Sequence, residues 1–331
     1  MSVSTDTAKS SVDRRRYSMP GQALRTTLLP ISGLIILITL FSITADNFLS
    51  MPTMYTVLRE ASVVLVVSIG LTFVVLMGSI DLSVGATVTL AGLVSARVAE
   101  GYTWPTAVAA GILAGAGIGV INGAIFAFAK VPSFLTTLGT SLAISGLALW
   151  YVGGRPVQVS DSSFLGISQS TWIGTIPNIA LWAFLLWGVF SLIGLHTRFG
   201  RYMYAIGGGE VVSHLSGIPV RRYKFLAMVL CGTFAGVGGV LLTARVGAAT
   251  PGMGDKLTLM AIAAVVMGGT ALTGGVGGVS KTVMGVLVIT VLSVGLNALV
   301  VPPYMQQIIQ GSVVVLAVAL TLDRAKLSVL K

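Results

Sequence analysis

The chain has 331 residues, of which 55% are hydrophobic and only 9% are charged, and its mean hydropathy is +0.95. Soluble domains carry roughly 25% charged residues because their surfaces must be wetted, so this composition excludes two water-soluble domains. The net charge of +10 would suit nucleic acid only on a soluble basic face; in a membrane protein it indicates basic residues held at one membrane surface.

Long apolar runs follow one another along the chain. A helix needs about 20 apolar residues to cross the hydrocarbon core of a bilayer. The sequence therefore predicts an all-α integral membrane protein with about ten transmembrane helices, some of them broken or re-entrant. The ten runs lie at about 27–45, 61–79, 82–98, 104–129, 134–153, 177–195, 224–244, 257–273, 282–300 and 303–322.

The distribution of basic residues predicts the orientation. With a cytoplasmic N-terminus, ten spans place fifteen Lys and Arg residues in the cytoplasm and five outside, as the positive-inside rule requires. Both termini are predicted to be cytoplasmic. The expected organisation is an arm over 1–26, a transmembrane domain over 27–325 and a tail over 326–331, with a polar external loop at 154–176 and a basic cytoplasmic loop at 196–223.

Residues 78–85 (GSIDLSVG) join two apolar runs and contain a carboxylate, Asp81. A carboxylate at that depth is costly unless it is paired, hydrated or caps a helix. We interpret Asp81 as the cap of the helix that follows a break, with a proton relay or ion site as the alternative. Residues 265–270 (VVMGGT) echo residues 75–79 (VLMGS), which suggests an internal repeat.

Glycines recur every four residues at positions 111, 115, 119 and 123. This spacing places them on one helical face, where the missing side chains let another helix approach closely. Asn122 lies beside this stripe. An amide within hydrocarbon needs a partner, so Asn122 either joins two helices or contacts a transported solute.

The basic loop at 196–223 contains a short amphipathic segment from Glu210 to Leu215, bracketed by glycines 207–209 and by Gly217. Such a helix either anchors the loop at the membrane surface or docks a cytoplasmic partner. The basic side chains around it are expected to face lipid headgroups: Arg198, Arg201, Arg221, Arg222 and Lys224.

The sequence contains few residues or motifs suited to catalysis. Residues 275–282 (GVGGVSKT) resemble a phosphate-binding loop, but Ser280 replaces the glycine required before Lys281, and no strand is predicted ahead of them. No Ser–His–Asp set, carboxylate pair or metal-ligand spacing stands out, and the chain has one cysteine and two histidines. We therefore expect a non-enzyme with no catalytic residue, cofactor or metal of its own.

Several motifs in a fixed order resemble the permease subunits of bacterial ribose-type sugar ABC importers, within the branched-chain amino acid/sugar permease superfamily. The resemblance covers about residues 28–325. It rests on GSIDLSVG (78–85), NG (122–123), PSFLTTLGT (132–140), FGRYMYAIGGGEVVSHLSGI (199–218), AIAAVVMGGTALTGGVGG (261–278), GLNAL (295–299) and QQIIQG (306–311).

This resemblance implies a ten-helix permease of the bacterial inner membrane, embedded in lipid, that pairs with a second permease copy, either identical or a close paralogue. An external sugar-binding protein would deliver a monosaccharide or related polyol, and ATPase subunits on a separate polypeptide would use ATP and Mg²⁺. The implied coupling helix contains Glu210, Val211, His214, Leu215 and Gly217. Candidates for the helix break and the pathway are Asp81, Ser83, Asn122, Ser133, Thr136, Asn297, Gln306 and Gln307.

Two positions depart from the pattern of the family. Ser79 stands where many relatives have a second glycine, and Met260 stands where many have an acidic residue, so the sequence does not identify the sugar. The alternative function is a self-sufficient secondary transporter or channel. That class needs intramembrane ionisable residues, for which Asp81 is the candidate.

Overall fold

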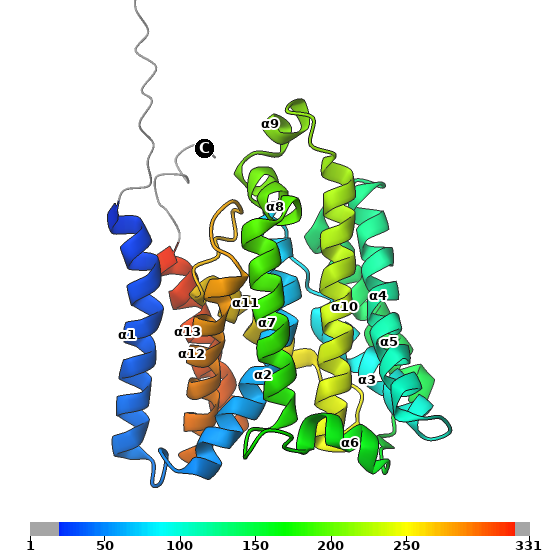
Figure 1. Cartoon of the computed structure of the whole chain (residues 1–331), viewed down its shortest axis with the longest axis vertical. Helices are drawn as coiled ribbons and strands as arrows, with labels where there is room; N and C mark the ends of the chain where they lie inside the picture. The colour runs from blue at the N-terminus through cyan, green and yellow to red at the C-terminus, as the bar shows by residue number, and fades with distance from the viewer. Residues whose placement is uncertain (1–19, 322–331) are drawn as a thin grey trace, which may run out of the picture.

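The computed structural model describes residues 20–321, with side chains described for residue 28 and residues 30–316. Most of the arm predicted at 1–26 and all of the tail at 326–331 lie outside this range. Nearly all of the described chain is helical (Figure 1). The elements are α1 (Pro20–Thr44), α2 (Met51–Leu76), α3 (Val84–Ala99), α4 (Trp104–Ala127), α5 (Ser133–Val152), β1 (Val157–Gln158), α6 (Ser162–Gln169), α7 (Asn178–His196), α8 (Arg198–Gly208), α9 (Glu210–Leu215), α10 (Val220–Val246), β2 (Ala248–Ala249), α11 (Asp255–Met267), α12 (Val279–Ala298) and α13 (Pro303–Thr321).

Each of the ten predicted runs falls on a helix. Within the described residues, six helices are long and apolar enough to cross a membrane: α2, α4, α5, α7, α10 and α12. Helices α3 and α11 are shorter, with 16 and 13 residues, and each adjoins a break. An all-α membrane protein is therefore confirmed, whereas the number of ten spans stays a prediction.

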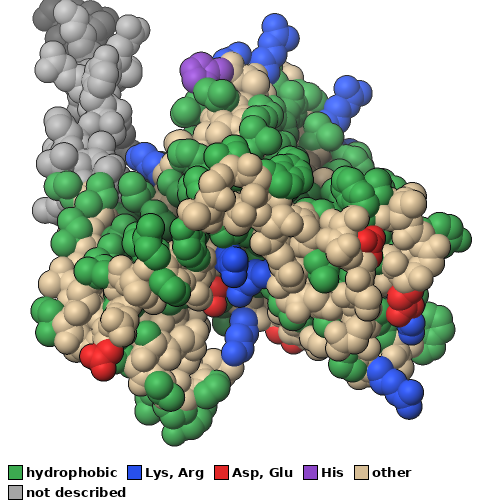
Figure 2. Space-filling view, turned by 60° about the horizontal axis from the view of Figure 1, so that its bottom comes forward, with side chains coloured by type: hydrophobic (Ala, Val, Ile, Leu, Met, Phe, Trp, Pro, Cys, Tyr) green, Lys and Arg blue, Asp and Glu red, His purple; other side chains and the backbone are tan. Residues whose placement is uncertain are grey.

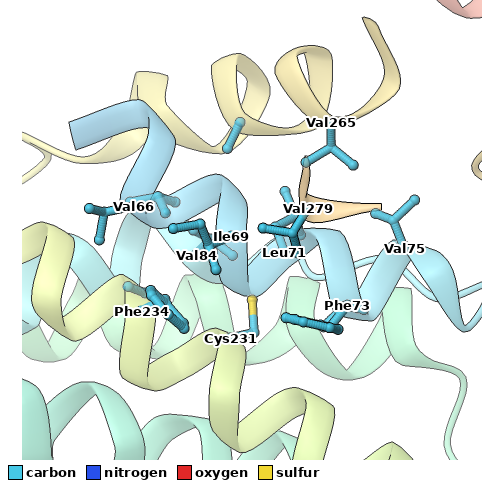
Figure 3. Close-up of a cluster of buried hydrophobic side chains, with 14 of the residues drawn as sticks. Val66, Ile69, Leu71, Phe73, Val75, Val84, Cys231, Phe234, Val265 and Val279 are labelled. Carbon is cyan, nitrogen blue, oxygen red and sulfur yellow. The ribbon is translucent and has the colours of Figure 1, made fainter. Parts of the chain in front are cut away.

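Helix α2 forms the centre of the molecule. All its residues from Ala61 to Leu76 are buried, so no face of this half of the helix is left for lipid. Figure 3 shows Leu71 and Phe73 of α2 beside Cys231 and Phe234 of α10. A helix that is apolar all round needs partners on every side, and here α7, α8, α10, α11 and α12 supply them.

Helices α4 and α10 pack with their backbones in contact. A side chain at Gly115 would collide with Gly232 and Gly236 of α10, and one at Gly119 would collide with Met228 and Val229. Gly111 and Gly123 face α10 in the same way. The predicted glycine stripe is thus a helix-packing face, as its four-residue spacing indicated.

The two long loops lie at opposite ends of the bundle (Figure 1). Helices α8 and α9 stand at the upper end, where α1 begins and α13 ends. Helix α6 and the antiparallel β1–β2 pair lie at the lower end, where the Gln169 amide donates hydrogen bonds to the last carbonyls of α10. Figure 2 turns this lower end toward the viewer and shows Lys and Arg side chains in a hollow near its centre.

Candidate functional site: a helix break and an exposed terminal helix

Helix α2 ends in a glycine stop. The Gly78 N–H donates to the Val75 carbonyl at 2.9 Å and the Ser79 N–H donates to the Val74 carbonyl at 3.1 Å. Gly78 has a φ of 76°, a left-handed conformation that an L side chain rarely adopts. This stop turns the chain into the segment that carries Asp81.

Asp81 is buried and organises the start of α3. Its Oδ1 accepts one hydrogen bond from the Ser83 N–H at 2.8 Å and a second from the Ser83 hydroxyl at 2.6 Å. The Asn122 Nδ2 group of α4 donates to that same hydroxyl oxygen at 2.8 Å. The Cys231 thiol of α10 also lies beside the carboxyl. Asp81 therefore closes a local turn onto Ser83, the residue before Val84, and the described residues show no hydrogen bond from an amide of α3 to its carboxylate, so the capping role stays a prediction.

Hydroxyl groups from other helices accept the remaining free amides of the break. The Ile80 N–H donates to Ser133 Oγ at 3.3 Å and the Leu82 N–H donates to Thr137 Oγ1 at 3.0 Å, both on α5. The Gly85 N–H donates to Thr258 Oγ1 of α11 at 2.9 Å. A buried amide without a partner is costly, so these hydroxyls hold the break in place. Ser133 was among the residues predicted from the sequence, whereas Thr137 and Thr258 were not.

The echo at residues 265–270 has the same geometry as the stop after α2. The Gly269 N–H donates to the Val266 carbonyl at 2.8 Å, and the Thr270 N–H donates to the Val265 carbonyl at 3.1 Å. The loop that follows this second stop lies against the first stop, because a side chain at Gly274 would collide with Gly78. Two breaks with the same hydrogen-bond pattern are what an internal repeat with a pathway at its interface would produce.

The other pathway candidates do not join this cluster. Gln306 Nε2 of α13 donates to Asn297 Oδ1 of α12 at 2.9 Å, beside the connection between these two helices at the lower end of the bundle (Figure 1). Gln307 is exposed there. Thr136 of α5 is buried, and its hydroxyl has no hydrogen-bond partner among the described residues. The structure thus places Asp81, Ser83, Asn122 and Ser133 together at the helix break. Asn297 and Gln306 lie together at the lower end of the bundle.

The predicted amphipathic segment is helix α9, with the predicted limits Glu210 and Leu215. Three large aliphatic side chains project from it, with exposed fractions of 72% for Val211, 69% for Val212 and 80% for Leu215. His214 is exposed as well. Val212 was not among the predicted coupling residues, although it shares the exposure of its neighbours. An aliphatic surface of this kind at the tip of a loop is typical of a docking site.

Glycines define both ends of α9. Gly209 alone separates α9 from α8, because Gly207 and Gly208 belong to α8. At the other end Gly217 has a φ of 81°, and the Ile218 N–H closes the turn on the Ser213 carbonyl at 3.1 Å. A side chain at Gly217 would meet no other atom within 4 Å, so its role is conformational.

Helix α8 joins the α9 segment to the two breaks. Gly207 packs so closely on the Leu76 carbonyl at the end of α2 that a side chain there would collide with it. The same carbonyl accepts a hydrogen bond from the Gly275 N–H at 2.8 Å. The Tyr204 hydroxyl donates to the Gly277 carbonyl at 2.7 Å, and burial raises the pKa of this phenol above its usual value. The glycine-rich segment 275–282 thus uses its Gly275 amide and its Gly277 carbonyl for hydrogen bonds within the protein. Its likeness to a phosphate-binding loop therefore has no structural counterpart.

A buried helix break inside an apolar bundle, with an exposed aliphatic helix at one end, fits a membrane permease. Residues 53–318 match the family described as "Branched-chain amino acid transport system / permease component". The chain belongs to this family.

Curated relatives are similar over nearly the whole chain. The ribose import permease protein RbsC of Escherichia coli K12 is 37% identical over 299 residues, covering 86% of this chain and 90% of the relative. RbsC of Bacillus subtilis is 36% identical, with coverages of 90% and 92%. The galactose/methyl galactoside import permease protein MglC of Escherichia coli K12 is 34% identical, with 87% and 91%. No solved structure gives a significant match.

These relatives confirm the predicted resemblance to permeases of ribose-type ABC importers. Together with the six apolar helices, they identify a multi-pass protein of the bacterial inner membrane.

Proposed function

We propose that this chain forms the translocation path for a monosaccharide or related polyol in a binding-protein-dependent ABC importer. In this proposal the path is completed by a second permease copy, identical or paralogous. An external sugar-binding protein delivers the solute, and cytoplasmic ATPase subunits supply the energy by hydrolysing Mg·ATP. The ribose and galactose permeases among the relatives support the sugar class.

One observation carries the coupling part of the proposal. Helix α9 exposes Val211, Val212 and Leu215 at the tip of the loop that the charge distribution assigns to the cytoplasm. Exposed aliphatic side chains on a short helix cost solvation free energy unless a protein groove covers them. The groove of an ATPase subunit is the partner that this family requires, so α9 is the proposed coupling helix.

The test introduces charge on this surface. Val211→Asp together with Leu215→Asp should weaken assembly with the ATPase by roughly tenfold or more, because buried carboxylates are costly in an apolar groove. The measurements are co-purification of the ATPase and uptake of radiolabelled ribose, galactose and polyols into proteoliposomes. Val300→Asp, which replaces an aliphatic side chain 85% exposed at the opposite end, is the matched control for assembly.

Two results would contradict the proposal. Assembly of the double variant at the wild-type level would remove α9 from the ATPase interface. Solute uptake driven by an ion gradient in vesicles without the ATPase would instead favour the secondary-transporter alternative, for which Asp81 would be the candidate.

A further inference from the structure

Lys224, in the first turns of α10, does not face lipid headgroups as the sequence suggested. Its Nζ lies 2.7 Å from both carboxylate oxygens of Glu210, the first residue of α9. The Lys224 side chain is only 15% exposed, against 55% for Glu210. The same Nζ lies 4.8 Å from the centroid of the Phe126 ring in α4. This ammonium group of α10 therefore contacts two other helices, α9 and α4.

Within the described part of the chain, this is the single ion pair that a residue of α9 makes. Apart from this pair, α9 follows α8 through the single residue Gly209, ends in the turn at Gly217, and buries Ser213 alone among its six residues. An ion pair between fully exposed side chains would add little, but this ammonium is shielded from water and lies over an aromatic face. It is therefore suited to hold α9 in one orientation against the bundle.

Two helices lead from Lys224 to the break at Asp81: α4, through Phe126, and α10, to which Lys224 itself belongs. One turn before Phe126 on α4 is Asn122, which donates to Ser83, and Ser83 donates in turn to Asp81. Two turns after Lys224 on α10 is Cys231, which lies beside the same carboxyl. The glycine contacts bring the backbones of α4 and α10 directly against each other.

We propose that Lys224 is a positioning residue that fastens the coupling helix α9 to the α4–α10 pair. A displacement of α9 by the ATPase then moves this pair as one body and reaches the break at Asp81. This inference rests on the proposed function, since it assumes that α9 docks on the ATPase. Proximity alone does not show that two residues are energetically coupled; a double-mutant cycle measures that coupling.

The experiment uses the reconstituted complex of the full chain, its ATPase and its binding protein. The variants are Lys224→Met, which retains the apolar stem, Lys224→Arg, Glu210→Lys, Lys224→Glu and the exchanged pair Glu210→Lys with Lys224→Glu. Three quantities are measured: the Kd of the ATPase subunits, their stimulation by the loaded binding protein, and solute molecules transported per ATP hydrolysed. Arg97→Met removes the 2.9 Å ion pair with Glu100 at the other end and is the control.

We expect Lys224→Met to keep ATPase binding but to lower the transport-to-hydrolysis ratio by roughly tenfold, the scale of one lost charge-assisted contact. Lys224→Arg should couple normally, because a guanidinium retains both contacts. Either single charge reversal should uncouple, since it places like charges together. The exchanged pair should recover part of the coupling, because it restores the ion pair but not the cation over Phe126.

Each remaining outcome overturns a defined claim. Wild-type coupling in Lys224→Met, or no recovery in the exchanged pair, rejects the role of Lys224 while leaving α9 as the docking helix. Loss of ATPase binding in Lys224→Met also rejects it, because the residue would then belong to the docking surface. If the Val211 and Leu215 variants assemble normally, the proposed function itself fails.

Discussion

Asp81 accepts two hydrogen bonds from one residue, Ser83, inside the bundle. Asp81→Leu removes the oxygen that accepts both bonds and leaves two buried donors of Ser83 unpaired, at about 1–3 kcal/mol each. Asp81→Asn retains an oxygen acceptor and caps about as well. We expect the Leu variant to lose thermal stability in detergent and membrane abundance, and the Asn variant to retain both and much of the transport. A stable Asn variant that transports nothing would show that the charge itself is required.

The residues of the break show what a single sequence can predict. Asp81 was recognisable because a carboxylate between apolar runs needs a local explanation, and the hydrogen bond to Ser83 is local. Thr137 and Thr258 were not recognisable, since they accept amides 55 and 173 residues away, and threonine in a hydrophobic helix is unremarkable by itself. Lys224 was misinterpreted for the same reason: only the fold brings Glu210 and Phe126 to its ammonium.

At the scale of elements, glycine determines how closely α4 and α10 approach. Gly115→Ala places a methyl group against the Gly236 backbone at 2.6 Å and should destabilise the fold by about 1–3 kcal/mol through overpacking. Gly117→Ala, on the same helix, meets nothing within 4 Å and should be neutral or slightly stabilising, because alanine favours a helix. Thermal unfolding of the two variants in detergent is the comparison. Equal midpoints would show that the backbones can separate without cost.

The apolar runs and the positions of glycine in the sequence predict most of the helices that the structure contains. The limits of α9 and the stop at Gly78 follow from local glycine chemistry, which the sequence displays directly. The apolar run at 257–273 predicts a full span, whereas α11 ends at Met267 and the chain then turns through a glycine-rich loop. Hydropathy cannot distinguish a short helix plus an apolar loop from a continuous helix, because both remove the same side chains from water.

At the scale of the whole molecule, the prediction to test is which end of the bundle faces the cytoplasm. The structure places the 196–223 loop and the 154–176 loop at opposite ends of the bundle (Figure 1). The positive-inside rule assigns the first of these loops, with Arg198, Arg201, Arg221 and Arg222, to the cytoplasm. Because the single native cysteine, Cys231, is fully buried, it should react little with a bulky maleimide and give a low background.

We therefore predict the labelling pattern of two cysteine variants in spheroplasts treated with a membrane-impermeant maleimide. Ser163→Cys, in exposed α6, should be labelled in intact spheroplasts, whereas His214→Cys, in exposed α9, should be labelled only after the membrane is opened. The unmodified chain controls for Cys231, and labelling of both variants in opened spheroplasts controls for accessibility. The reverse pattern would place α9 outside, where no ATPase could reach it, and would reject the coupling role of α9 and of Lys224 together. Labelling of both variants in intact spheroplasts would contradict the predicted ten-span topology, because an odd number of crossings must separate the two loops.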